Sequence, residues 1–169
     1  NRILKGANET IAWMKKKKIP YKFVTNTTTF SRKDIAKKLQ DLGLDILEID
    51  ILSANYAGAL YLQKINPTSC KLILTESAKR DYSQFNIQKE NPEFIIIGDI
   101  GNHWTYDLMN ELLKDILNGS QIIALHKGRY FETENGLNID TGAFISGLEY
   151  VTNTSSFLIG KPNKSFFEL

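Results

Sequence analysis

The sequence lacks several features that would place a protein in a special class. Cys70 is its only cysteine, which excludes an intrachain disulfide and fits a reducing compartment such as the cytoplasm. Its fully apolar runs extend over about four residues, as at 94–97, whereas a membrane-spanning helix needs about 20. The 21 basic and 19 acidic residues leave a net charge of only +2. We therefore expect a cytoplasmic protein that binds neither membranes nor nucleic acid.

The sequence does have the composition and patterning of a folded α/β protein. Apolar residues make up 42% and charged residues 24%, a balance typical of globular domains. Segments with the apolar, β-branched character of buried strands alternate with segments of helical spacing, and this alternation predicts a parallel α/β architecture. The expected strands are 21–25, 71–75, 94–97, 121–125 and 157–159, and the expected helices are 31–42, 54–63, 105–118 and 143–151, with a short hairpin within 127–142.

Two polar loops directly follow expected strands. Thr25, Asn26 and Thr27 follow the first strand, and Lys161 follows the last. In open α/β sheets, ligands bind beyond the carboxyl ends of the strands. A hydroxyl group and backbone N–H groups there can hold phosphate oxygens, and an ammonium group can neutralise their charge. Each loop taken alone is more often an ordinary turn.

Taken together, the two loops point to a family. Val24-Thr25-Asn26-Thr27 and Gly160-Lys161-Pro162 resemble the second and third motifs of haloacid dehalogenase-type phosphatases, in the branch with a large α/β cap inserted between these motifs. Segments 53–62, 91–97 and 128–150 resemble the connecting helix and the cap of that branch. The resemblance covers nearly the whole chain. It implies an α/β protein with a Rossmann-like core, incomplete here, at 1–66 and 154–169, and a cap domain at 67–153.

The resemblance also implies a chemistry. Members of this family are Mg²⁺-dependent phosphatases that hydrolyse small phosphorylated compounds through an aspartyl-phosphate intermediate. Thr25 and Lys161 would be catalytic residues, because Thr25 would hydrogen-bond a phosphate oxygen and Lys161 would offset charge on the phosphoryl group and the nucleophile. Both would also bind substrate, together with Asn26, Thr27 and Arg129, and Lys127 or Arg129 would contact the leaving group from the cap.

The resemblance further implies that the nucleophilic and metal-binding aspartates of the first and fourth motifs lie outside this chain, so that we expect no metal ligands within it and no activity from the 169 residues alone. The segment ending in Gly98-Asp99 is similar to the fourth motif, but it precedes Lys161 instead of following it. Four residues after Asp99 stands His103, which is not a carboxylate. We therefore expect Asp99 to cap a turn within the cap domain.

Two other functions remain open at this point. A catalytically inactive relative that binds phosphate or a protein partner would share all the residues named above. A receiver-like α/β module could also place a threonine and a lysine around a phosphorylated aspartate, although the separation of Thr25 and Lys161 argues against it. The resemblance allows a homodimer formed through the cap, alongside the small phosphorylated substrate as a partner.

Overall fold

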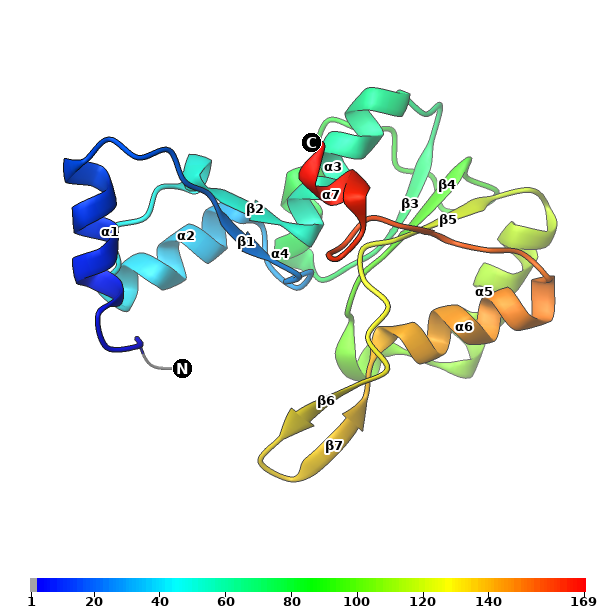
Figure 1. Cartoon of the computed structure of the whole chain (residues 1–169). Helices are drawn as coiled ribbons and strands as arrows, with labels where there is room; N and C mark the ends of the chain where they lie inside the picture. Colours follow the sequence, from blue (N-terminus) through cyan, green and yellow to red (C-terminus); the bar gives the residue numbers. More distant parts are fainter. Residues whose placement is uncertain (1–2) are drawn as a thin grey trace.

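The computed structural model describes residues 3–169, which form two groups of elements joined side by side (Figure 1). The first group contains a two-stranded parallel sheet, in which β1 (Phe23–Thr25) pairs with β2 (Ile51–Ser53). Helices α1 (Ala7–Lys16) and α2 (Arg32–Asp41) and a 3₁₀ turn (Glu48–Asp50) complete it. Apolar residues of α1, α2 and β2, and one from the segment after α2, make a small core of their own: Ile11, Ile35, Ala36, Ile46 and Ile51.

The second group is built on a four-stranded, all-parallel sheet. Its strand order is β3 (Cys70–Ile73), β4 (Phe94–Ile97), β5 (Gln121–Ala124) and β8 (Phe157–Leu158). Helix α3 (Ala54–Ile65) lies on one face, and helices α5 (Tyr106–Leu117) and α6 (Thr141–Thr152) lie on the other. Because side chains alternate along a strand, Ile96 packs in the cluster on the α3 face, whereas Ile95 and Ile97 pack in the cluster on the other. A sheet covered on both faces needs such continuous apolar strands.

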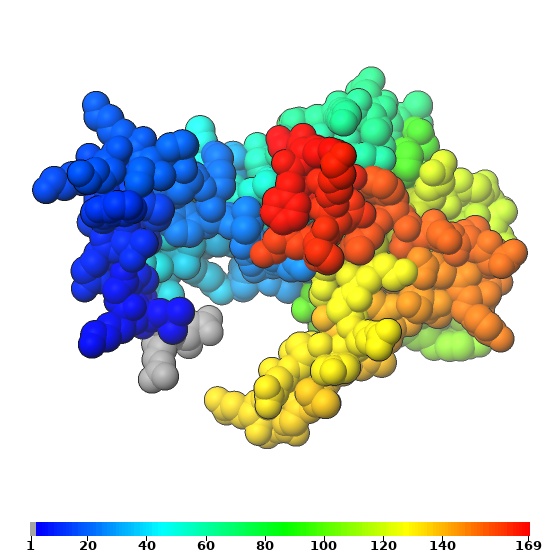
Figure 2. Space-filling view, in the orientation of Figure 1, coloured from blue at the N-terminus to red at the C-terminus, as the bar shows by residue number. Residues whose placement is uncertain are grey.

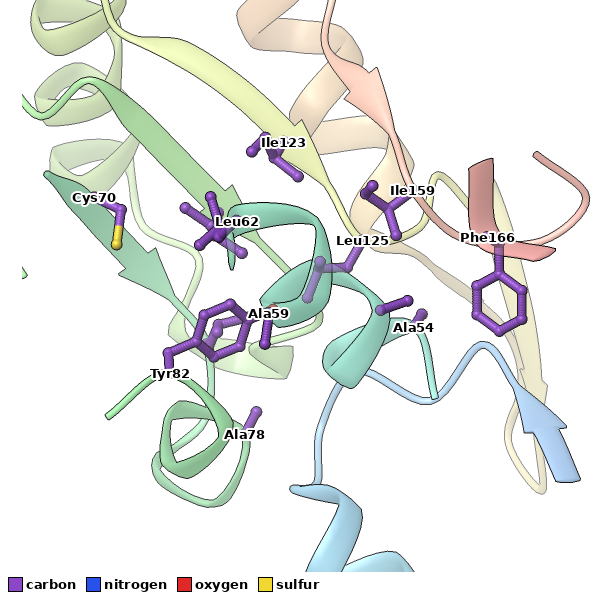
Figure 3. Packing of buried hydrophobic residues seen from close by; sticks show 13 residues of the cluster. Ala54, Ala59, Leu62, Cys70, Ala78, Tyr82, Ile123, Leu125, Ile159 and Phe166 are labelled. Carbon is purple, nitrogen blue, oxygen red and sulfur yellow. The ribbon is translucent and has the colours of Figure 1, made fainter. Parts of the chain in front are cut away.

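Small residues let α3 approach the sheet closely. Ala54, Ala57 and Ala59 are buried in the cluster that Figure 3 shows, together with Leu125 and Tyr82. A side chain at Gly58 would overlap the ends of the Leu125 and Tyr82 side chains. Close packing of a helix on a sheet at the native density leaves no room for even one further methyl group at such a position.

Shorter elements complete the chain. They are α4 (Glu76–Lys79) and α7 (Lys164–Phe167), 3₁₀ turns at Arg80–Tyr82 and Gly101–His103, and the antiparallel hairpin of β6 (Tyr130–Thr133) and β7 (Gly136–Ile139). The hairpin projects from the body of the molecule (Figure 2). Within residues 3–169, no helix is both long enough and apolar enough to cross a membrane.

The predicted α/β class with parallel strands is confirmed, and so are most of the expected elements. β4 has the predicted bounds, and Thr105 caps α5 at its expected start by accepting the N–H of Leu108. The strand expected at 71–75 ends at Ile73 instead, because Thr75 serves as the N-cap of α4. The strand expected at 21–25 begins at Phe23, because its three-residue partner β2 begins only at Ile51.

The predicted domain boundaries at 66/67 and 153/154 stay predictions. Two elements on the core side of these boundaries nonetheless lie with the predicted cap strands. α3 covers one face of their sheet, and β8 pairs with β5 in register Ile123 to Phe157. The four-stranded sheet therefore extends past residue 153, and the helix that covers one of its faces precedes residue 67.

Candidate functional site

The loop after β1 and the loop after β8 lie against each other, although 135 residues separate them. The Asn26 side chain joins them with two hydrogen bonds: its Nδ2 donates to the Lys161 carbonyl at 3.0 Å, and its Oδ1 accepts the Lys161 N–H at 2.9 Å. The side-chain amide thus pairs with a backbone peptide much as one strand pairs with another. The structure therefore brings together Thr25, Asn26, Thr27 and Lys161, as their positions after strand ends led us to expect.

The ammonium group of Lys161 belongs to this cluster and carries an uncompensated charge. Its Nζ donates to the Val24 carbonyl at 3.1 Å, which places it at the carboxyl end of β1. Within residues 3–169 it makes no ion pair. A partly exposed cation beside a hydroxyl-rich loop is available to neutralise an anion there.

Thr25 and Thr27 together offer one free hydroxyl donor. Thr25 Oγ1 accepts the N–H of Thr27 at 3.2 Å and lies 2.8 Å from Thr27 Oγ1. A threonine hydroxyl donates one hydrogen bond and accepts up to two. Because only one hydrogen atom can occupy the contact between the two oxygens, the other hydroxyl hydrogen remains free to donate elsewhere. The N–H of Asn26 is also unused by other described residues.

Gly160 sets how closely the two loops approach. Ile159 still continues the pairing of β8 with β5, since its N–H donates to the Ala124 carbonyl at 2.9 Å. One residue later, a Cβ atom at Gly160 would overlap the Leu125 carbonyl oxygen and lie 3.4 Å from Asn26 Oδ1. Only glycine lets the chain pass here with Lys161 still within reach of Asn26.

The β1 loop leads directly into α2 at a partly buried carboxylate. Asp81 Oδ2 accepts the N–H of Arg32 at 3.1 Å and a hydrogen bond from Asn55 Nδ2 at 2.8 Å. Burial raises the pKa of Asp81 above its ordinary value, although these two hydrogen bonds act in the opposite direction. The start of α2 is thereby fixed to the 3₁₀ turn that follows α4.

A cavity of about 520 Å³ opens between the end of β4 and the base of the hairpin, and Asp99 in its lining donates its N–H to Thr28 in the loop after β1. The lining of the cavity mixes polar residues such as Asp99 with three aromatic side chains, Trp104, Phe131 and Phe144. Trp104 and Phe144 stack with their ring centroids 4.5 Å apart and their planes 5° from parallel. A larger depression of about 780 Å³ runs along α5, but neither polar loop lines it.

Arg129 is not brought into this cluster. It is exposed at the base of the hairpin, and its side chain makes no hydrogen bond or ion pair with the loops after β1 and β8. Its neighbour Lys127 binds Glu149 at 2.7 and 2.9 Å instead. Burial by itself would raise the pKa of Glu149, but hydrogen bonds from Lys127 and Ser156 outweigh it and hold the pKa below its ordinary value. Substrate binding by Arg129 stays a prediction.

The site does not contain the ligands that a magnesium ion requires. Mg²⁺ prefers carboxylate oxygens and water, whereas the two loops carry hydroxyl, amide and ammonium groups. Within residues 3–169, no three His, Cys, Asp or Glu side chains are grouped so that they could hold a metal ion. Asp99 caps a turn, as predicted: its Oδ1 accepts the Gly101 N–H at 2.8 Å. The groups that the two loops carry are thus suited to an anion and not to Mg²⁺.

Two features of the site were missed from the sequence. The pairing of Asn26 with the Lys161 backbone had no sequence signal, because one partner is a peptide group. The burial of Thr28, which is 2% exposed, was hidden in a run of three threonines that indicated only a polar loop. The glycine at 160 was the one available clue, since a glycine next to a functional residue often marks a close backbone approach.

Comparison with known proteins finds relatives among the haloacid dehalogenase-like hydrolases and phosphatases. The family model of the haloacid dehalogenase-like hydrolases matches residues 1–88. Haloacid dehalogenase-like hydrolase domain-containing protein 2 of Rattus norvegicus is 33% identical over 164 residues, which are 96% of this chain and 61% of that protein. Phospholysine phosphohistidine inorganic pyrophosphate phosphatase of Homo sapiens is 29% identical, over 96% of this chain and 60% of that protein. The chain thus spans about 61% of the length of these curated relatives.

Solved structures agree with these relatives. A double mutant of the thermostable NPPase from Geobacillus stearothermophilus superposes with a TM-score of 0.89 at 25% identity, covering 98% of this chain and 68% of that one. The putative p-nitrophenyl phosphatase from Bacillus subtilis gives a TM-score of 0.89 at 26% identity, covering 97% and 65%. The resemblance drawn from the two motifs is confirmed by these matches.

Proposed function

This chain belongs to the haloacid dehalogenase-like hydrolases, and from that premise we propose that it forms the phosphate-binding part of a phosphatase acting on a small phosphorylated compound. The observation that carries the proposal is the joining of the loops after β1 and β8 by Asn26. This pairing places the Lys161 ammonium group and one free threonine hydroxyl at the same strand end.

In this proposal, the described residues bind and orient the phosphoryl group. The free hydroxyl of Thr25 or Thr27 and the N–H of Asn26 donate to phosphate oxygens. Lys161 offsets the negative charge that concentrates there as the phosphoryl group is transferred. An aspartate outside this chain attacks phosphorus to form the aspartyl-phosphate, and the alcohol of the substrate leaves. Mg²⁺, held by carboxylates that are also outside this chain, would supply further positive charge.

The cavity beside Asp99 is suited to the organic part of the substrate. Its lining residue Asp99 is hydrogen-bonded to Thr28 in the loop after β1, and three of its lining residues, Trp104, Phe131 and Phe144, are aromatic. We therefore propose that the leaving group lies against the Trp104–Phe144 stack, where apolar surface is removed from water. We propose a location in the cytoplasm, because the single thiol, Cys70, has no second cysteine with which to form an intrachain disulfide.

A homodimer is proposed through the hairpin. Tyr130, Leu137 and Ile139 share one of its faces and are 62%, 67% and 62% exposed. Apolar side chains gathered on a projecting element are typical of a surface that a partner covers. Leu137 and Ile139 also line the 520 Å³ cavity, so in this proposal the partner would lie next to the place proposed for the leaving group.

The test uses the longest natural form of the protein that contains these 169 residues. We expect it to hydrolyse p-nitrophenyl phosphate in the presence of Mg²⁺, and we expect Lys161→Ala to lower kcat/KM by roughly 100-fold. The matched control is Lys164→Ala, because Lys164 is 87% exposed and pairs only with Glu168. Turnover at the wild-type level in Lys161→Ala would contradict the role of this lysine. Binding of inorganic phosphate without any turnover by the wild type would favour the inactive relative.

A further inference from the structure

Thr28 is a polar residue buried at the junction between the loop after β1 and the four-stranded sheet. It is 2% exposed, and its Oγ1 accepts the N–H of Asp99 at 2.9 Å across 71 residues of sequence. Gly98 packs directly on it: a Cβ atom at Gly98 would lie 3.0 Å from Thr28 Cβ and 2.8 Å from Leu74 Cδ2. The carboxyl end of β4 therefore rests on the residue that follows Thr27.

Three contacts hold consecutive residues of this loop. The Thr27 carbonyl accepts the N–H of Asn55 at 3.3 Å, and the Thr29 carbonyl accepts a hydrogen bond from Thr75 Oγ1 at 2.6 Å. Of the three, only the contact of Thr28 with Asp99 reaches a residue that lines the 520 Å³ cavity. That hydrogen bond links the phosphate-binding loop directly to a residue in the lining of the cavity.

Resting on the function proposed above, we infer that Thr28 is a positioning residue that fixes the spacing between the phosphate-binding loop and the cavity for the leaving group. A substrate can bind the phosphate-binding loop and the cavity at the same time. Contacts in the cavity increase its rate of reaction only if the separation of the two places matches the length of the substrate. A displacement of about 1 Å between a substrate and the groups that orient it can lower the rate of reaction by roughly 100-fold. Thr28 would thus select among substrates by the size of their leaving group.

The positioning role of Thr28 depends on its hydroxyl group, which accepts the Asp99 N–H. Valine has nearly the shape of threonine but cannot accept a hydrogen bond, so Thr28→Val leaves the Asp99 N–H without its acceptor. A donor without a partner in a partly buried place draws water or a shifted chain toward itself. The turn at Gly98-Asp99 then moves relative to the loop, while Lys161, Asn26 and Thr25 keep their own contacts. Thr28→Ser keeps the acceptor.

The experiment compares two substrates in the longest natural form of the protein. In this proposal the aromatic ring of p-nitrophenyl phosphate lies against the Trp104–Phe144 stack, whereas acetyl phosphate has no aromatic group to place there. We expect Thr28→Val to lower kcat/KM for p-nitrophenyl phosphate by roughly tenfold and to leave that for acetyl phosphate within about twofold. Thr28→Ser is expected to restore the wild-type ratio between the two substrates.

Each outcome bears on a different statement. An equal loss on both substrates, or no loss on either, overturns the positioning role of Thr28 and leaves the proposed phosphatase intact. A wild-type protein that hydrolyses neither substrate removes the proposed function itself. Thermal unfolding of each variant shows whether it is folded. Should Thr28→Val not fold, Gly98→Ala disturbs the same contact from the β4 side, and an unchanged substrate ratio there also overturns the inference.

Discussion

At the scale of single residues, Gly160 limits how the site can be built. We expect Gly160→Ala to destabilise the protein by about 1–3 kcal/mol, the usual cost of adding an atom to a filled space. The added Cβ would overlap the Leu125 carbonyl oxygen, which belongs to the backbone and cannot swing aside. The loop would have to move as a whole, which separates Lys161 from Asn26. Urea unfolding measures the first effect, and weaker binding of inorganic phosphate measures the second.

Gly147→Ala is the control for this prediction. Gly147 lies within α6, and the atom nearest to an added Cβ is Met109 Cε at 3.7 Å, an ordinary contact. Alanine favours a helix over glycine by up to about 1 kcal/mol, so this variant is expected to be neutral or more stable. Equal stability of the two variants would show that the Gly160 contact is not tight.

The functional residues could be predicted from the sequence only where chemistry is carried by side chains at strand ends. Thr25, Asn26 and Lys161 were predicted as site residues in this way, and the structure brings them together. Thr28 was not, because its role depends on the backbone N–H of Asp99, and a peptide group has no signature in the sequence. Its burial likewise depends on how β4 is placed against the loop after β1.

At the scale of elements, local patterns predicted which segments form helices and strands, but partners decided where these elements end. Apolar periodicity and caps located α5 and β4 closely. The three-residue β2 was missed, because Ile51 and Leu52 precede a helix start without turn residues to separate them, and only pairing with β1 makes them a strand. The packing of α3 with the predicted cap strands likewise depends on contacts distant in sequence.

Helix α6 offers an electrostatic prediction. Glu149 on α6 binds Lys127 on one side and the N–H and hydroxyl of Ser156 on the other, the latter at 2.8 and 2.7 Å. Its pKa in the folded protein lies below the ordinary 4.5. A lowered folded pKa means that the carboxylate stabilises the fold above the unfolded pKa, and that this contribution is lost as the pH falls through the folded pKa.

We therefore expect acid to erase the difference between the wild type and Glu149→Gln. At pH 7 the variant should have the lower free energy of unfolding, and the two values should converge between about pH 5 and pH 3. Urea unfolding across this range measures the convergence. Glu132→Gln is the control, because Glu132 is exposed on β6 and makes no ion pair with a described residue. Curves that stay parallel down to pH 3 would speak against the Glu149 contacts as a source of stability.

At the scale of the whole molecule, the two groups of elements meet where the proposed site lies. The β1–β2 group contributes the hydroxyl-rich loop, and the four-stranded sheet contributes both the Lys161 loop, after β8, and the cavity, after β4. Neither group contains the site alone. The relative position of the two groups, which sequence periodicity does not determine, therefore decides whether phosphate and leaving group can be bound together.

The hairpin leads to the prediction about assembly. β6 pairs with β7 so that Tyr130 faces Ile139 and Glu132 faces Leu137, which sets Tyr130, Leu137 and Ile139 on one face of a projecting element (Figure 2). Burying such side chains is worth about 25 cal/mol per Å² of apolar surface, and a two-stranded hairpin has no core of its own in which to bury them. A second copy of the chain offers the same apolar face, so a two-fold contact would cover both at once.

We accordingly expect the protein to be dimeric at micromolar concentration in sedimentation equilibrium. We expect Leu137→Lys to raise the Kd of the dimer by at least about tenfold, because the lysine ammonium group would lose its bound water when the face is covered. Asn138→Lys places the same charge one residue away on the opposite face and should leave the dimer intact. A monomeric wild type would reject the hairpin interface. Equal dissociation by both lysine variants would reject it as well, since a general charge effect would then suffice.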